Sequence, residues 1–174
     1  MELEKKIKNK RVHTIVMIIV AVLIAAAILL AIFLPRSTSG PRNGTVTIEI
    51  RCDQLSEDMS KLNDKTLEQY IPKDGIILAE TEWQIKKKET TVFDVLTEVC
   101  MDKNIQLEYS STPVYGGSYI EGIHYLYEFS AGKYSGWMYK VNGESPSYAA
   151  DKVKLKGGET ITWYYSVDYR QDGM

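Results

Sequence analysis

The chain has 174 residues, of which 44% are hydrophobic and 25% are charged, and this is enough for one folded domain with additional segments. The formal net charge is −2, but residues 45–174 hold 14 lysine and arginine residues against 21 aspartate and glutamate residues, a net charge of −7. An acidic domain argues against binding to nucleic acid or to an anionic membrane surface, because both need a concentrated basic face.

The N-terminal region is predicted to anchor the protein in a membrane. Residues 14–34 contain no charged residue. As a helix they would span about 31 Å at roughly 1.5 Å per residue, which matches the hydrocarbon core of a bilayer. A cleaved signal peptide is the alternative, although its apolar region usually has only about 7–15 residues. Residues 1–13 carry five lysine and arginine residues, so the positive-inside rule predicts a cytoplasmic tail before the helix and an extracellular domain after it.

The segment after the predicted helix is rich in proline, glycine and serine. Residues 35–44 read PRSTSGPRNG, which favours a short linker over a helix. The globular domain is then expected at residues 45–170, followed by a tail at residues 171–174. This organisation predicts a single-pass protein of the cell membrane, with the domain held close to the outer surface.

The first half of the domain has two strand patterns and one helix pattern. Residues 45–52, TVTIEIRC, alternate between apolar and polar residues as a half-buried strand does. Residues 53–72 are polar and are expected to form a loop with a helical turn or two. A second strand region begins at Gly75. Residues 90–104 have a threonine cap and apolar residues at helical spacing, which predicts one amphipathic helix that packs on a sheet.

The second half of the domain is predicted to be mostly strand. Residues 105–109 and 119–129 have strand character, and a turn-rich loop separates them. The segment 135–143, SGWMYKVNG, alternates and ends in Asn-Gly, which favours a tight turn. Residues 153–156 alternate before a Gly-Gly turn, and residues 160–166, TITWYYS, form the last strand. The expected fold class is α+β, a mostly antiparallel sheet with one packed helix.

The two cysteines, Cys52 and Cys100, both lie in the part predicted to be extracellular, where disulfides persist. We predict that they form a bridge, which would close a loop of roughly 49 residues and contribute about 4 kcal/mol in the chain-entropy model. The alternative is two reduced, buried thiols that act as small hydrophobic residues.

The two histidines offer little for a metal or catalytic site. His13 lies at the cytoplasmic end of the predicted anchor, and His124 lies in GIHYLY, which alternates like a strand. With one extracellular histidine and a bridged cysteine pair, a zinc site of the usual ligand types is hard to assemble. Glu80 and Glu82 share one face of a strand, but no cleft is implied around them. The sequence therefore predicts no metal ligand, no catalytic residue and no enzymatic activity.

The order of the segments resembles the β-grasp layout, and several stretches carry a closer resemblance. VTIEIRCDQL, TVFDVLTEVC, YIEGIHYLYEF, SGWMYKVNG and LKGGETITWYY, taken in order, are similar to the transcobalamin-like C-terminal domain family, a bacterial family of largely unknown function. The resemblance covers residues 45–168. It implies a β-grasp-like fold and a surface module on secreted or anchored proteins.

The resemblance also has implications for the ligand of the domain and for the pairing of its cysteines. The animal relatives use a similar domain to cover one face of cobalamin, together with a large helical barrel for which this chain has no counterpart. Family members often have a second cysteine pair near the positions of Ala131 and Ala150, and both are alanine here. Cys52 and Cys100 stand where such members also place cysteines, which supports the predicted bridge.

The first functional hypothesis is a non-catalytic binding module with a corrinoid as the favoured ligand and no other cofactor. Aromatic residues near glycine-rich loops support it, because apolar aromatic surfaces suit a flat macrocycle. The predicted ligand-binding residues are Tyr115, Tyr134, Trp137 and Tyr148, and Tyr119 lies in a similar loop environment.

Two alternatives remain open. Trp137, Tyr139 and Trp163 also fit a reading in which they simply fill a small core. The second functional hypothesis is a protein-interaction or structural module at the cell surface, which would use an exposed strand edge or loop and bind no small molecule. In both hypotheses the N-terminal helix binds the membrane. They differ in the partner of the domain, which is a corrinoid in the first and another surface protein in the second.

Overall fold

The computed structural model describes residues 44–86, 89–112 and 116–172 and, before them, residue 17 alone. Apart from Met17 and Gly44, the predicted tail, anchor helix and linker lie outside the described residues. Within the described ranges, no helix is long and apolar enough to cross a membrane. Residues 44–172 all belong to one compact unit, Ser39–Met174.

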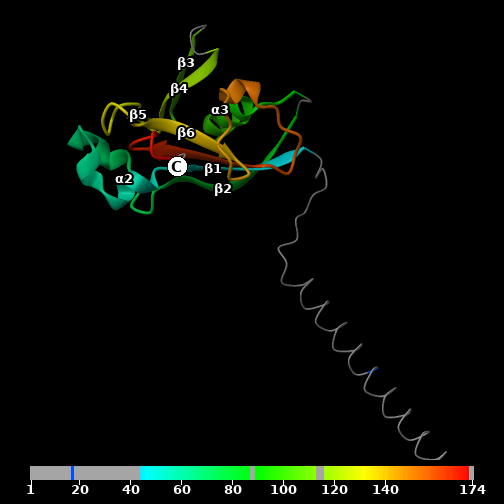
Figure 1. Ribbon diagram of the computed structural model, residues 1–174, viewed down its shortest axis with the longest axis horizontal. Coiled ribbons are helices and arrows are strands. Elements are labelled where there is room, and N and C mark those ends of the chain that lie inside the picture. The colour runs from blue at the N-terminus through cyan, green and yellow to red at the C-terminus, as the bar shows by residue number, and fades with distance from the viewer. Residues whose placement is uncertain (1–16, 18–43, 87–88, 113–115, 173–174) are drawn as a thin grey trace, which may run out of the picture. The chain divides into compact units, whose positions relative to one another are not determined.

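A four-stranded sheet forms the centre of this unit (Figure 1). Its strands lie in the order β2-β1-β7-β6 and comprise β1 (Thr45–Arg51), β2 (Ile76–Gln84), β6 (Gly136–Val141) and β7 (Thr160–Ser166). β1 pairs antiparallel with β2 and parallel with β7, and β6 pairs antiparallel with β7. The prediction of an α+β domain is confirmed, with a parallel pair of strands at the centre of the sheet.

The alternation in the sequence places one face of this sheet in the core. On β1 the side chains of Val46, Ile48 and Ile50 are at most 1% exposed. Ile50 lies opposite Trp163 on β7, which is 2% exposed. Burial of this apolar surface is the main favourable contribution to folding, at about 25 cal/mol per Å² removed from water.

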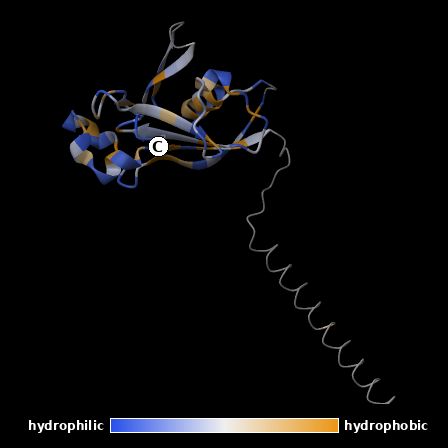
Figure 2. Cartoon of the chain, viewed as in Figure 1, coloured by the Kyte–Doolittle hydropathy of each residue, from blue (hydrophilic) through white to orange (hydrophobic). Residues whose placement is uncertain are grey.

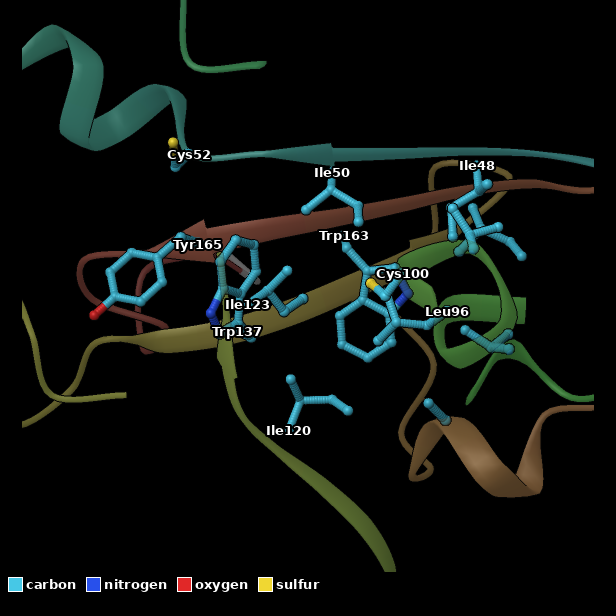
Figure 3. Close-up of a cluster of buried hydrophobic side chains, with 14 of the residues drawn as sticks. Ile48, Ile50, Cys52, Leu96, Cys100, Ile120, Ile123, Trp137, Trp163 and Tyr165 are labelled. Atoms are coloured by element: carbon cyan, nitrogen blue, oxygen red, sulfur yellow. The ribbon is translucent and has the colours of Figure 1, made fainter. Parts of the chain in front are cut away.

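The predicted helix is α3 (Val92–Lys103), and it covers the buried face of the sheet (Figure 3). Thr91 caps it, since its hydroxyl accepts from the Asp94 N–H while the Asp94 carboxylate accepts from the Thr91 N–H. Figure 2 shows that α3 carries both hydrophobic and hydrophilic residues. Its buried residues are Val92, Val95, Leu96, Val99 and Cys100. The helix ends at Asn104, whose φ of 55° is left-handed.

A second sheet of three strands has the order β3-β4-β5. β3 (Leu107–Thr112) and β4 (Gly117–Ile123) form a hairpin that extends away from the four-stranded sheet (Figure 1), and β5 (Leu126–Tyr127) pairs with the end of β4. The short helices are α2 (Asp53–Glu57), η1 (Met59–Lys61), η2 (Lys65–Tyr70) and η3 (Ala150–Lys152).

His124 lies in a turn, and the prediction of one continuous strand over residues 119–129 is wrong. Ile123 pairs with Leu126, and the two residues between them, His124 and Tyr125, have φ values of 53° and 64°. Both N–H groups of the turn bind Gln106, one through its carbonyl at 2.8 Å and the other through its side-chain oxygen at 2.7 Å. These bonds hold a backbone conformation that bulky residues seldom adopt.

The predicted disulfide is not formed, and Cys52 and Cys100 are free thiols. Cys52 follows β1 and precedes α2, whereas Cys100 lies on α3, and Figure 3 shows the two sulfur atoms in separate parts of the core cluster. Both side chains are buried, with 0% and 2% exposure, so each fills core volume as a small hydrophobic residue. The two elements that carry them pack at different places on the sheet, which the sequence spacing did not reveal.

The burial of the thiols predicts slow chemical modification. We expect both cysteines to resist Ellman's reagent in the folded protein and to react together when the protein is unfolded in guanidinium, because the buried thiol is neither accessible nor ionised. Non-reducing and reducing mass measurements should give the same mass after alkylation under denaturing conditions, with two alkyl groups added. A protein that accepts no alkyl group until it is reduced would contradict the structure.

Candidate functional site

A groove lies between β4 of the small sheet and β6 at the edge of the large sheet. It contains a hollow of about 270 Å³ whose walls come from β4, β6, β7 and the segment before η3. The aromatic residues that line it are Tyr119, Trp137, Tyr139, Tyr148 and Trp163. We refer to it as the first hollow.

β6 is an edge strand, and its unpaired edge faces this groove. The Asn142 N–H donates to the Thr160 carbonyl at 2.8 Å, so the even-numbered residues of β6 direct their peptide groups toward β7. The peptide groups of the odd-numbered Trp137 and Tyr139 therefore point to the opposite side, where β4 approaches β6 without pairing with it. The groove thus combines aromatic walls with backbone donors and acceptors.

Packing and hydrogen bonds hold the aromatic rings of the floor in place. The Tyr139 ring lies 5.1 Å from the Trp163 ring at an angle of 31°, and the Tyr139 hydroxyl donates to the Tyr148 carbonyl at 2.6 Å. Trp137 Nε1 donates to the Leu126 carbonyl at 2.8 Å. Burial, and secondly the nearby Asp151 carboxylate, raise the pKa of Tyr139 to about 12, so it remains a hydrogen-bond donor at neutral pH.

Tyr148 differs from the other rings because it is exposed. Its side chain is 71% exposed at the rim of the first hollow, in the segment that follows the Asn142-Gly143 turn. Its carbonyl accepts a hydrogen bond from the Tyr139 hydroxyl. The exposed ring is therefore accessible at the rim of the first hollow.

A second hollow of about 500 Å³ adjoins the first and shares Tyr119, Trp137 and Met138 with it. Its other lining residues are Ser110, Glu121, Glu128, Phe129, Gly136 and Tyr169. The Tyr119 hydroxyl donates to the Glu128 carboxylate across this hollow. The groove as a whole is therefore apolar and aromatic at one end and acidic at the other.

The structure brings together two of the four predicted ligand-binding residues. Trp137 and Tyr148 line the first hollow. Tyr134 lines neither hollow, because its ring packs under the Arg170 guanidinium at 3.5 Å and against Tyr169 at 6.0 Å. Tyr115 lies outside the described residues.

Sequence reasoning did not assign Tyr139 and Trp163 to the site. Both were read as core residues, and both are partly that, but each also presents a face to the first hollow. Two features of the sequence could have indicated them. Tyr139 lies two residues after Trp137 on β6 and so shares its face, and Trp163 lies at the centre of β7. No pattern in the sequence indicated that β4 would leave the edge of β6 open.

Within the described ranges, no group of three histidine, cysteine, aspartate or glutamate residues is placed to hold a metal ion. Burial raises the pKa of Cys52 and of Cys100 to about 12, so both thiols are protonated at neutral pH. For Cys52 the nearby Asp53 and Asp74 carboxylates add to this effect.

Comparison with known proteins connects part of the chain to one family. Residues 89–167 match the model of a domain of unknown function, DUF4430. This span covers α3, the small sheet, β6 and all of β7, and it includes both hollows except Tyr169. No curated protein matches the chain.

Two solved structures are similar to this one. A protein of Ruminococcus gnavus, described as a candidate metal-binding protein, aligns with a TM-score of 0.44 at 15% identity and covers 70% of this chain and 95% of its own. Haptocorrin in complex with Cbi aligns with a TM-score of 0.46 at 13% identity and covers 76% of this chain. The alignment spans 28% of the haptocorrin chain.

Proposed function

We propose that residues 45–170 form a non-catalytic binding module at the outer surface of a cell membrane, with a corrinoid as its ligand. The observation that carries this proposal is the groove between β4 and β6, with its fixed aromatic floor and one exposed ring, Tyr148, at its rim. Binding sites for small molecules are typically concave and apolar, with a few well-placed polar groups.

The chemistry of a corrinoid suits this groove. The macrocycle is flat and apolar on its faces, and its rim carries carboxamide arms that both donate and accept hydrogen bonds. The aromatic rings offer contact area to a face, and the peptide groups of Trp137 and Tyr139 offer partners to the arms. Since the first hollow holds about 270 Å³, the module would cover one edge or face of such a ligand and leave the rest exposed.

The lining of the first hollow supports binding over catalysis. Among its described residues there are hydroxyl, aromatic and aliphatic side chains, and no carboxylate, imidazole or thiol. Ser118 and Ser145 lack a base beside them there, and a serine hydroxyl needs one to act as a nucleophile.

The location outside the cell rests on the sequence. The uncharged segment 14–34 and the five cationic residues before it support an uncleaved anchor with a cytoplasmic N-terminus.

The test is a titration of the full chain, purified in detergent, with cobinamide, followed by tryptophan fluorescence and calorimetry. Trp137 and Trp163 line the first hollow, so binding should quench their emission. Saturable binding with a dissociation constant below about 10 μM would support the proposal. No binding at about 100 μM would exclude a stand-alone corrinoid module.

Replacement of Tyr148 by alanine is expected to weaken cobinamide binding about tenfold, equivalent to about 1.4 kcal/mol, and to leave the free energy of unfolding within about 0.5 kcal/mol of the parent. The ring is 71% exposed, and its carbonyl contact with Tyr139 survives the substitution. The matched control is Tyr125→Ala, which removes another exposed ring that lines neither hollow. Equal affinities for the two variants would place the ligand elsewhere.

A protein-interaction module is the second candidate, and the open edge of β6 favours it. An extended peptide could pair with the free peptide groups of Trp137 and Tyr139 and add a strand to the sheet. Under this function cobinamide should fail to bind, and amide hydrogen exchange at Trp137 and Tyr139 should slow only when the partner protein is present.

A further inference from the structure

The second hollow differs from the first in charge. Two carboxylates, Glu121 and Glu128, line it, and no lysine, arginine or histidine is among its described lining residues. Four aromatic rings, from Tyr119, Phe129, Trp137 and Tyr169, complete its walls. A cavity of about 500 Å³ with acidic and aromatic walls is electrostatically suited to a cation and unsuited to an anion.

The two carboxylates have different roles. Glu128 is held by the Tyr119 hydroxyl, and its N–H donates to the Glu121 carbonyl at 2.8 Å, which ties the two sides of the hollow together. The Glu121 carboxylate has no hydrogen-bond or ion-pair partner among the described residues. One acidic group is therefore positioned by the fold, and the other remains available to a ligand.

Two cationic residues near Tyr169, Arg170 and Lys133, contact other groups. Arg170 makes two bonds to Asp168, at 2.8 and 2.6 Å, and covers the Tyr134 ring. Lys133 lies over the same ring, with its Nζ 4.6 Å from the centroid. Neither residue lines the second hollow, so neither neutralises its carboxylates.

Two exposed aromatic rings form the rim of this hollow. Phe129 is 52% exposed and Tyr169 is 41% exposed. Phe129 also has a φ of 64°, a conformation that is costly for a bulky residue, and its peptide groups are held by Ser135 and Asn63. The fold thus holds an apolar ring at the mouth of an acidic hollow, where a ligand cation could contact its face.

We propose that the second hollow binds an organic cation, an ammonium or guanidinium group on an apolar chain, with Glu121 as its ion-pair partner. The aromatic walls would contact the carbon chain, and a ring face would contact the cation. Glu128 would add to the negative potential of the hollow. The cation could belong to a free amine or to a lysine or arginine side chain of another protein. This site goes beyond the proposed corrinoid function, because it uses a separate hollow and does not require that ligand.

The test uses the full chain in detergent with ¹⁵N-labelled tryptophan. The sequence has three tryptophans, so three indole signals are expected, and the Trp137 signal reports on the shared wall of the groove. The probes are n-butylammonium and its neutral counterpart n-butanol, together with the N-acetyl methylamides of lysine and glutamine. We expect saturable shifts of the Trp137 signal with the two cations, with a dissociation constant on the order of 1 mM, and at least tenfold weaker binding of the neutral probes.

The variants locate the site. Glu121→Gln keeps the shape of the side chain and removes its charge, and it should weaken both cations about tenfold. Phe129→Ala should weaken them about threefold through loss of the aromatic contact. The matched control is Glu57→Gln, an exposed carboxylate at the end of α2 that does not line the hollow, and it should change nothing. Circular dichroism should show that all three variants remain folded.

The outcomes separate the sources of the cation. Binding of n-butylammonium but not of the lysine derivative would support a free amine, and the reverse preference would support a side chain of a partner protein. Equal binding of charged and neutral probes, or an unchanged affinity in Glu121→Gln, would overturn the proposal. Neither result bears on cobinamide, whose titration reads the first hollow and Tyr148.

Discussion

Replacement of Trp163 by alanine is expected to lower the free energy of unfolding by about 3–5 kcal/mol, the range observed for large aromatic residues in protein cores. Trp163 lies on β7 between Ile50 of β1 and Tyr139 of β6, and its side chain is 2% exposed. Its ring packs on Tyr139 at 5.1 Å. Alanine would leave a cavity in the middle of the sheet, where strands on both sides prevent collapse.

Urea denaturation followed by far-UV circular dichroism measures this effect. The matched control is Trp83→Ala on the edge strand β2, where the ring is only half-buried and its Nε1 bonds to Glu98 at 3.0 Å. The control should lose about 1 kcal/mol, because its ring lies at the edge of the sheet, where part of its surface is open to solvent and the site can relax. If the two variants were equally stable, Trp163 would not be the centre of the core.

The sequence predicted the local elements of the fold well. TVTIEIR alternates because one face of β1 packs on α3, and the helix itself follows from Thr91 and its spaced valines. It did not predict that β1 pairs in parallel with β7, since that contact joins the two ends of the domain and no local pattern encodes it. The turn at His124 was missed for a different reason, because two bulky residues with positive φ give no glycine signal.

Two of the four predicted ligand-binding residues line the groove, and the position of Tyr134 away from it has a physical cause. Trp137, one of the predicted ligand-binding residues, lines the first hollow and is also 93% buried, so the core and the groove share the same ring. Tyr134 was assigned to the ligand because it lies beside a glycine, but residues 168–170 fold back over it. The bridge between Cys52 and Cys100 was inferred from their predicted compartment and from the family resemblance. Neither of these indicates where α3 places the sulfur atom of Cys100.

The second large effect is a loss of stability at alkaline pH, and the two free thiols dominate its onset. Burial raises the pKa of Cys52 and of Cys100 from 9.0 to about 12 in the folded protein. The thiols are neutral in the folded state at pH 10, whereas in the unfolded chain they are mostly ionised. The unfolded state therefore binds fewer protons, and this contribution is complete below about pH 9 and is lost as the pH rises toward about 12.

By pH 11 the ionisation of each thiol in the unfolded chain should have lowered the free energy of unfolding by about 3 kcal/mol. This figure follows from about 1.4 kcal/mol per pKa unit. The measurement is a series of urea denaturations between pH 8 and pH 11 on the parent and on the double variant Cys52→Ala, Cys100→Ala. The variant starts with lower stability, because two buried sulfur atoms are removed, but its curve should be flat through the first unit above about pH 9. Its later decline should follow the buried tyrosines, because burial raises the pKa of Tyr164 and of Tyr165 and raises that of Tyr139 from 10.0 to about 12, and Tyr139→Phe should reduce that decline. Parallel curves for the parent and the double variant would mean that the thiols do not titrate on unfolding, as a disulfide would require.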